Sequence, residues 1–260
     1  MTHIDRIANH LHQAHEERRQ FANLTGDLAP GSLENAYAVQ QALNGLWVAG
    51  TRGPIAGYKI ALTSKAIQDL VGVDEPCAGA IFASTVRQSP AQIVVSDFVR
   101  VGLEFELAFR MGKDVPEGGN YDGETIVQYV DTAMPAFELI EDRAADYSNL
   151  DANTLVADNA WSGGMVLGSP STAWKQLDLA SVRVTLTYNG EVETAVTGAA
   201  MGSPLISLAC LANLLTGQGR SLKAGDVVMS GSTLATRFAK PGDRAVYAVD
   251  GLGEVEISVR

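Results

Sequence analysis

The sequence has 260 residues, 46% of them hydrophobic and 19% charged, which is typical of a globular, enzyme-sized chain. Its 30 acidic and 19 basic residues give a net charge of −11, whereas nucleic-acid-binding proteins normally carry clustered basic residues. No segment approaches the roughly 18 apolar residues of a membrane span, and the first ten residues lack the apolar region of a signal peptide. We therefore expect a cytoplasmic protein with neither a nucleic acid nor a membrane as its partner.

The first 85 residues are predicted to be mainly helical. Apolar residues recur there at helical spacing, and Ser32 is a typical N-cap residue in front of such a run. The predicted elements are a helix over residues 3–22, a turn over 26–31, a second helix from Ser32 to about Gly50, a strand over 57–62 and a short helix from 63 to 72.

From residue 92 onward the pattern is mostly that of strands. Asn189-Gly190 between two alternating runs is typical of a tight hairpin turn. Two helices interrupt the strands, one capped by Asp122 and one opened by Ser203-Pro204 and ending at Gly217. The predicted strands are 93–100, 102–111, 135–141, 161–167, 181–188, 191–196, 226–231, 244–249 and 254–259.

These elements indicate an α+β fold. A small helical N-terminal part, residues 1–85, is expected to pack on a large mixed β-sheet core, residues 86–260. The two parts together are expected to form one compact unit.

Several common kinds of active site are disfavoured. All four histidines lie in the first fifteen residues, on or beside the expected solvent-exposed face of the first helix, which disfavours histidine-dependent triads and zinc sites. Cys77 and Cys210 form no CxxC pair, and we interpret them as small buried hydrophobic residues in a reducing compartment. No dinucleotide-binding, phosphate-loop or GxSxG motif is present. The chemistry is therefore expected from carboxylates, lysine, hydroxyls and a hard metal ion.

Carboxylates on predicted strands are the first candidates. Glu104 and Glu106 alternate with apolar residues, so they share one face of a strand about 6.5–7 Å apart. Glu138 lies in a second apolar strand, where an unpaired charge would be costly. Three such carboxylates suit an octahedral Mg²⁺ or Mn²⁺. The alternative is that they lie on ordinary solvated faces of antiparallel strands.

Lys59 is the second candidate, because Ile60, Ala61 and Leu62 beside it indicate a largely buried strand. Its side chain either extends outward to solvent or serves as a cation in a pocket. In a pocket it could form a Schiff base or offset the charge of an anionic substrate.

At these residues the sequence resembles a known family. The 2-keto-4-pentenoate hydratase/4-oxalocrotonate decarboxylase family, within the fumarylacetoacetate hydrolase superfamily, is similar to the chain from about Ser32 to Arg260. The segments that carry the resemblance, in the family's order, are GYKIALTSKAIQDLVGVDEP, GLEFELAFRMGKDVP, PAFELIEDR, ADNAWSGGMVLG, LKAGDVVMSG and GLGEVEISV. The resemblance implies a β core of the fumarylacetoacetate hydrolase C-terminal type that assembles into homo-oligomers.

The resemblance also assigns roles to individual residues. The family's metal carboxylates correspond to Glu104, Glu106 and Glu138. Its conserved lysine corresponds to Lys59, expected to be catalytic and substrate-binding. The remaining expected positions are Ser64 and Ser162, which would bind substrate, and Asp142 with Arg143, which would form a supporting pair behind the site.

Two positions depart from the family pattern. Cys77 stands where hydratases of the family usually have an aspartate, thought to transfer a proton, and the decarboxylase branch also tends to lack that aspartate. Ser203 stands where the family usually has a histidine. The WSGGMVLG segment nevertheless resembles hydratases more than decarboxylases.

The resemblance implies a divalent-metal-dependent lyase of aromatic-compound catabolism. Its substrate would be a small 2-oxo or 2-hydroxy dienoic acid, hydrated to a 4-hydroxy-2-oxo acid, with Mg²⁺ (or Mn²⁺) polarising the 2-oxygen and Lys59 stabilising the dienolate. The first alternative is decarboxylation of 4-oxalocrotonate; a C–C hydrolase comes third because it would need a histidine–glutamate pair. A further alternative is a catalytically weak subunit complexed with a homologous hydratase or decarboxylase.

Overall fold

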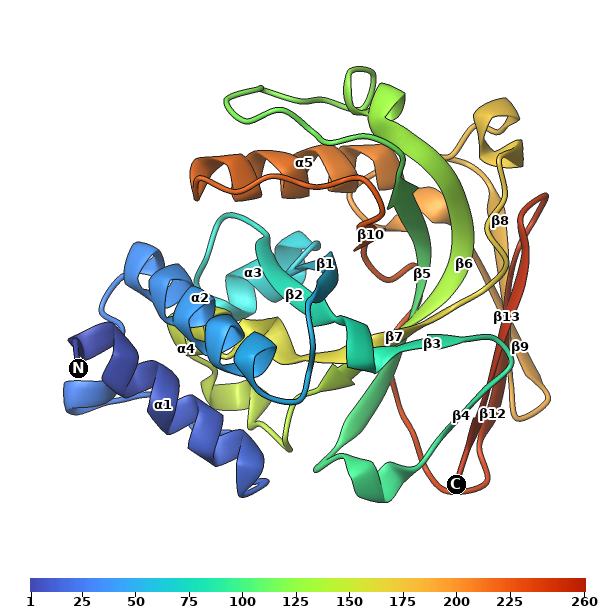
Figure 1. Cartoon of the computed structure of the whole chain (residues 1–260). Helices are drawn as coiled ribbons and strands as arrows, with labels where there is room; N and C mark the ends of the chain where they lie inside the picture. The colour runs from blue at the N-terminus through green and yellow to red at the C-terminus, as the bar shows by residue number, and fades with distance from the viewer.

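The computed structural model describes residues 1–260, apart from the side chains of residues 66, 67 and 70. Its strands form two sheets, one of eight strands and one of five. Figure 1 shows helices α1, α2 and α4 at one side of the molecule, the five-stranded sheet at the other, and the curved strands of the large sheet between them. The predicted α+β class, with few helices on a large mixed β core, is confirmed.

The helices are α1 (His3–Glu16), α2 (Leu33–Ala49), α3 (Lys65–Val71), α4 (Ala152–Ala157) and α5 (Pro204–Gly217). The large sheet has the order β2-β1-β10-β5-β6-β7-β3, with β11 also paired to β5, and the small sheet has the order β4-β13-β12-β8-β9. The strands are β1 (Ile55–Ala61), β2 (Cys77–Phe82), β3 (Val86–Gln88), β4 (Ala91–Ile93), β5 (Val101–Met111), β6 (Val130–Glu141), β7 (Ser162–Leu167), β8 (Arg183–Tyr188), β9 (Glu191–Val196), β10 (Val227–Met229), β11 (Arg237–Phe238), β12 (Arg244–Val249) and β13 (Gly253–Val259).

The antiparallel pair β5–β6 forms the centre of the large sheet. Leu103, Phe105 and Leu107 on one face of β5 are completely buried. The opposite face carries Glu104 and Glu106, and it is also covered, because Glu106 is completely buried as well. The alternative of a solvated glutamate face is therefore wrong for β5.

Strand β1 belongs to the same sheet, although it lies within the first 85 residues. It runs parallel to β10, and at Gly57 the two backbones approach so closely that an added Cβ would lie 1.9 Å from the carbonyl oxygen of Val227. Only glycine fits there. The resulting register places Lys59 opposite Met229 of β10 and Gly79 of β2.

Several predicted caps and turns are confirmed. The Ser32 hydroxyl accepts the amide N–H of Asn35 at the start of α2, and Ser203 accepts that of Leu205 at the start of α5. The Asn189-Gly190 hairpin joins β8 to β9, and Asn189 adopts a positive φ of 53°.

Other predicted boundaries were wrong for local reasons. Helix α1 ends at Glu16 rather than at residue 22, because Arg18 has a φ of 54° and the Arg19 N–H bonds back to the Ala14 carbonyl. The predicted strand over 93–100 is wrong, because β4 ends at Ile93, a helical turn follows over Val95–Asp97 and β5 begins only at Val101. Asp122 caps a turn rather than an α-helix. None of the helices in the described part of the chain has the length and apolar character needed to cross a bilayer.

Candidate active site

Three glutamates meet at the centre of the large sheet. Glu104 and Glu106 lie two residues apart on β5, and Glu138 on β6 is directly opposite Glu104 in the antiparallel register. One carboxylate oxygen from each lies within 4.8 Å of the others. Glu106 and Glu138 are 0% exposed and Glu104 is partly exposed. The alternation of β5 and the pairing with β6 therefore produce a buried cluster of acidic oxygens.

Three carboxylates this close together repel one another unless a proton or a cation offsets their charge. Burial, followed by the charges of the other two glutamates, raises the pKa of Glu106 well above its ordinary value. Burial also raises the pKa of Glu138 to about 7, although Lys59 opposes that change. Like charges held this closely favour either a proton or a cation between them.

The pattern of hydrogen bonds fits a cation. One oxygen of Glu106 accepts the Gly231 amide N–H at 2.7 Å, and one oxygen of Glu104 accepts the Thr236 hydroxyl at 2.7 Å. Oε1 of Glu106 and Oε2 of Glu138 are buried without a hydrogen-bond partner among the described residues. Buried acceptors of this kind are costly unless a donor or cation is present. Hard oxygen donors suit Mg²⁺ or Mn²⁺, so the residues present fit such an ion.

Lys59 lies against this cluster. Its side chain is 3% exposed, and Nζ is 2.6 Å from Oε1 of Glu138. Burial alone would lower the pKa of Lys59, but Glu138 and Glu104 outweigh it and the pKa is raised. The side chain is therefore a buried ammonium rather than one extended into solvent. A protonated amine is also a poor nucleophile, which disfavours the Schiff-base alternative.

Lys59 and Glu104 line a pocket of about 300 Å³, which we call the Lys59 pocket. Ser64 also lines it. Ser162 does not lie among the described lining residues; Ala160 and Trp161, just before it, form the wall instead. The pairing of β6 with β7 is irregular at this point, between Leu139 and Ile140.

Comparison with known proteins identifies the family. Residues 61–260 match the family model described as fumarylacetoacetate (FAA) hydrolase C-terminal. The chain belongs to the FAA hydrolase family. It is 32% identical over 252 residues to 2-keto-4-pentenoate hydratase of Paraburkholderia xenovorans (strain LB400), covering 96% of this chain and 93% of the relative. It is 31% identical over 258 residues to 2-hydroxyhexa-2,4-dienoate hydratase of Comamonas testosteroni, covering 98% and 96%.

The fold is also that of a solved decarboxylase. 4-Oxalocrotonate decarboxylase from Pseudomonas putida G7, complexed with magnesium and adipate, superposes with a TM-score of 0.91 at 27% identity. The superposition covers 99% of this chain and 97% of that one. A second structure of that enzyme, complexed with calcium and acetate, has a TM-score of 0.90 and covers 100% and 99% of the two chains.

The Ala160–Trp161 wall of the pocket is held in an unusual backbone conformation. Asn159, Ala160 and Trp161 all have positive φ values, of 55°, 49° and 56°. Such residues persist only where the surroundings determine them. The Asn159 side chain exchanges two hydrogen bonds with the backbone of Ala80, both at 2.8 Å. An added Cβ on Gly79 would lie 2.6 Å from the Asn159 carbonyl oxygen, so a glycine is needed beneath the wall.

Asp158, two residues before Ala160, is buried between two basic groups. Its carboxylate oxygens lie 2.7 Å from Nε2 of His15 and 2.6 Å from Nη2 of Arg143. The expectation that all four histidines lie on or beside the solvent-exposed face is therefore wrong for His15, whose ring packs edge-on against Trp47. Sequence reasoning missed this contact because the two partners are 143 residues apart.

The buried position of His15 predicts a pH effect on stability. Burial lowers the pKa of His15 more than Asp158 raises it. The unfolded chain should take up a proton near the ordinary histidine pKa of 6.5, where the folded chain does not, so this contribution is present above pH 6.5 and lost as the pH falls. Urea unfolding at pH 7 and pH 5 should show wild type losing more stability than His15→Gln, by at most about 1.4 kcal/mol per pH unit. Equal losses would contradict the assignment. Asp158 does not contribute in this window, because its pKa lies below 3.8.

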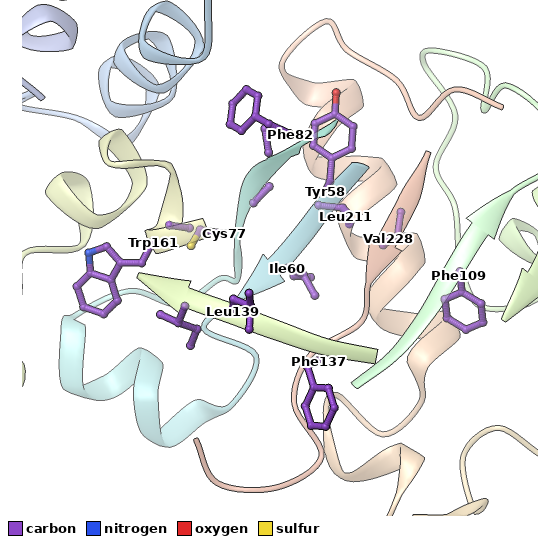
Figure 2. Packing of buried hydrophobic residues seen from close by; sticks show 14 of the residues in the cluster. Tyr58, Ile60, Cys77, Phe82, Phe109, Phe137, Leu139, Trp161, Leu211 and Val228 are labelled. Atoms are coloured by element: carbon purple, nitrogen blue, oxygen red, sulfur yellow. The ribbon is translucent and has the colours of Figure 1, made fainter. Parts of the chain in front are cut away.

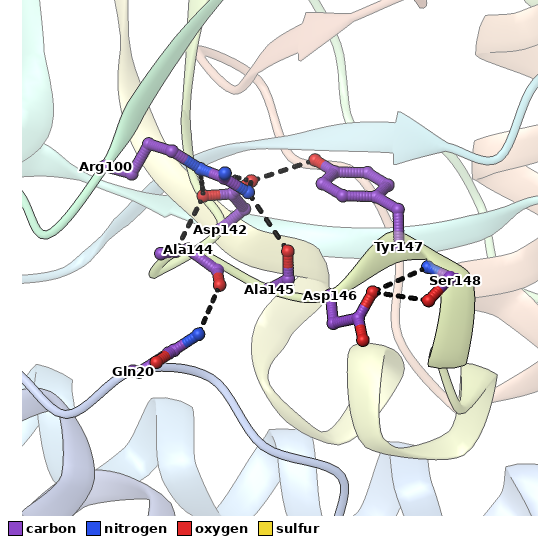
Figure 3. Close-up of polar contacts among 8 residues, drawn as sticks. All are labelled: Gln20, Arg100, Asp142, Ala144, Ala145, Asp146, Tyr147 and Ser148. Carbon is purple, nitrogen blue, oxygen red and sulfur yellow. Dashed lines mark hydrogen bonds and ion pairs between the residues drawn. The ribbon is translucent and has the colours of Figure 1, made fainter.

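The expected pairing of Asp142 with Arg143 was wrong. Asp142 accepts hydrogen bonds from the Arg100 guanidinium, including one from Nε at 2.8 Å, and from the Tyr147 hydroxyl at 3.0 Å. Figure 3 shows Asp142 between these two side chains. Arg143 points away to Asp158. Tyr147 lines the Lys59 pocket, so Asp142 supports the pocket through Tyr147.

The two departures from the family pattern have different surroundings. Cys77 is buried, and burial raises the pKa of its thiol to about 12, so it is neutral at physiological pH. Figure 2 shows it among hydrophobic side chains near Trp161 and Leu139. Ser203 is the N-cap of α5. Neither residue is among the described residues that line the Lys59 pocket.

Proposed function

We propose that the chain is a divalent-metal-dependent hydratase that converts a 2-hydroxy-2,4-dienoate of the 2-keto-4-pentenoate type to a 4-hydroxy-2-oxo acid. The observation that carries this proposal is the buried cluster of Glu104, Glu106 and Glu138 with Lys59 at the end of one pocket. The hydratases that are 31–32% identical over nearly the whole chain support the same reaction class. The reaction would belong to the catabolism of aromatic compounds.

The three glutamates would hold Mg²⁺ (or Mn²⁺), which when bound supplies a Lewis acid for the carboxylate and 2-oxygen of the substrate. Lys59 is a buried ammonium with three donors, and only one is needed for Glu138. It would stabilise the negative charge on the 2-oxygen when the enol loses its proton. A proton is gained at C5, and water then adds across the C3–C4 bond, with hydroxyl on C4 and hydrogen on C3. The net change is the addition of one water.

The remaining residues would position the substrate. Ser64 would contact it from the segment after β1, and Ser162 would act from the start of β7. Asp142 would support the pocket through Tyr147, and Arg143 through Asp158 and the wall at residues 160–161. The chain is proposed to be a cytoplasmic homo-oligomer, in which form it could also associate with a homologous hydratase or decarboxylase.

Turnover by the isolated chain tests the proposal. The protein with Mg²⁺ should remove the ultraviolet absorbance of 2-hydroxypenta-2,4-dienoate and release 4-hydroxy-2-oxopentanoate. Chelation of the metal should abolish the reaction. Loss of absorbance without that product would contradict hydration.

Decarboxylation of 4-oxalocrotonate is the second candidate, favoured by the TM-score of 0.91 with the decarboxylase. It would use the same stabilisation of charge at the 2-oxygen but release CO₂ from a second carboxylate. Incubation with 4-oxalocrotonate and measurement of CO₂ distinguishes the two reactions. A chain that turns over neither substrate would support the weak-subunit alternative.

Cys77→Asp is expected to raise hydration turnover, by up to about 10²-fold, because an added acid–base group can transfer a proton. Burial raises the pKa of Cys77 and the Lys59 ammonium partly opposes that rise, so Lys59 lies close enough to influence an aspartate at this position. Cys77→Asn is the matched control, with similar shape and no titratable group. Metal affinity should be unchanged in both variants. Strong CO₂ release by the wild type, with no gain in hydration from Cys77→Asp, would favour the decarboxylase.

A further inference from the structure

The charged side chains that line the Lys59 pocket are all at one end of it, beside the glutamate cluster. Among its described lining residues, Lys59 is the only basic residue and Glu104 the only acidic one, and both lie at the glutamate cluster. These groups, with the cation that the cluster would hold, match one carboxylate and its adjacent 2-oxygen. The rest of the substrate must therefore contact the other walls.

Those walls are largely apolar. They include Leu62, Ile140, Leu150, Leu155, Trp161 and Leu234. Ala160 and Ala200 add further apolar surface. Such walls stabilise a hydrocarbon chain by removing its surface from water.

The hydroxyls in the lining that have described partners are already used as donors. Tyr147 donates to Asp142, Ser232 to the Leu234 carbonyl, and Thr236 to Glu104. A second carboxylate on the substrate would therefore gain no charged partner here, and these three hydroxyls would have to give up their present bonds to serve as its donors.

The basic side chains around the pocket are also paired. Arg100, which stacks on Tyr147, is paired with Asp142, and Arg143 is paired with Asp158. Lys65, just after Ser64, is exposed and pairs with carboxylates at the surface. None of the three lines the pocket.

From this distribution of charge we infer that the pocket accepts dienoates whose chain beyond C4 is apolar and rejects those with a second, distal carboxylate. The inference rests on the proposed function and narrows its substrate class. It also separates this chain from the structural neighbour, which was solved in complex with adipate, a dicarboxylate. Burying a carboxylate without a partner costs several kcal/mol, so we expect discrimination of about 10²-fold or more.

Binding of unreactive analogues tests the inference without turnover. Calorimetric titration of the Mg²⁺-loaded protein should show 2-oxohexanoate binding about 10²-fold or more tightly than 2-oxohexanedioate, which differs by a terminal carboxylate. Equal affinities, tighter binding of the diacid, or binding of neither compound would overturn the inference. The hydration assay is separate, so a protein that shows this preference but no turnover would contradict the proposed function alone.

A gain of charge in the wall provides a second test. Leu150 is half-buried in the lining, and Leu150→Arg would add an unpaired guanidinium there. The affinity for 2-oxohexanoate divided by that for 2-oxohexanedioate should fall by at least about 10-fold in this variant, because the distal carboxylate gains a partner. Leu150→Met is the control and should retain the wild-type preference. An unchanged preference in a folded Leu150→Arg protein would count against the inference.

Discussion

Glu106→Gln should reduce the affinity for Mn²⁺ or Mg²⁺ by at least about 10²-fold and abolish metal-dependent turnover. The substitution keeps the side chain's shape and can retain the hydrogen bond from the Gly231 amide, but it removes a charged donor from the centre of the cluster. Hard divalent cations depend on such carboxylate oxygens. Calorimetric titration with Mn²⁺ measures the affinity directly.

The same variant should behave differently without metal. Burial and repulsion raise the pKa of Glu106 well above its ordinary value, so ionising it in the folded protein is unfavourable. We therefore expect metal-free Glu106→Gln to be at least as stable as the wild type, while the rise in melting temperature on adding metal is lost. Glu141→Gln is the matched control, because Glu141 follows on β6 but accepts the Val99 amide N–H outside the cluster. Wild-type affinity in Glu106→Gln would contradict a metal site here.

The local parts of the candidate site could be predicted from sequence. Strict alternation in VGLEFELAFRM indicates a strand with Glu104 and Glu106 on one face, and that strand is β5. Lys59 among apolar neighbours indicated a charge with a special environment. These patterns depend on residues adjacent in sequence, so they could be recognised without the fold.

The longer-range parts could not. The antiparallel register places Glu138 opposite Glu104, 34 positions away, and no local pattern specifies that pairing. Strand β2 was missed because its CAGAIF segment is buried on both faces and has no alternation. The contact of His15 with Asp158 is also long-range, so the helical spacing of the apolar residues around His15 did not reveal it. The family resemblance, rather than spacing, connected the third glutamate to the first two.

The two residues just after the end of β6 were assigned less accurately than the glutamates within the strands. Asp142 and Arg143 are adjacent in sequence, but β6 ends at Glu141 and Arg143 adopts a φ of 48°. Their side chains consequently reach different partners, Arg100 and Asp158. Adjacency at the end of a strand is therefore weak evidence for pairing.

Lys59→Met should reduce kcat by about 10²-fold or more, because a buried cation that stabilises transition-state charge would be lost. Methionine retains the length and apolar stem of the side chain, so the packing of β1 should change little. Lys59 is 2.6 Å from Glu138, and its removal should raise the pKa of that glutamate further above about 7. Metal binding should then become more sensitive to protons near neutral pH. Steady-state turnover at saturating Mg²⁺ separates the effect on kcat from this effect on metal binding.

Two comparisons make the result specific to the buried ammonium. Lys65→Met removes a lysine six residues later, but that side chain is exposed and paired with Asp69 and Asp74, so kcat should stay within about two-fold of wild type. Lys59→Arg keeps the charge but is larger, and in a site that is only 3% exposed the extra volume should prevent full activity. If Lys59→Met kept wild-type kcat at saturating metal, the lysine would only balance the charge of Glu138 in the folded protein. In that case the enolate would depend on the three glutamates and their cation alone.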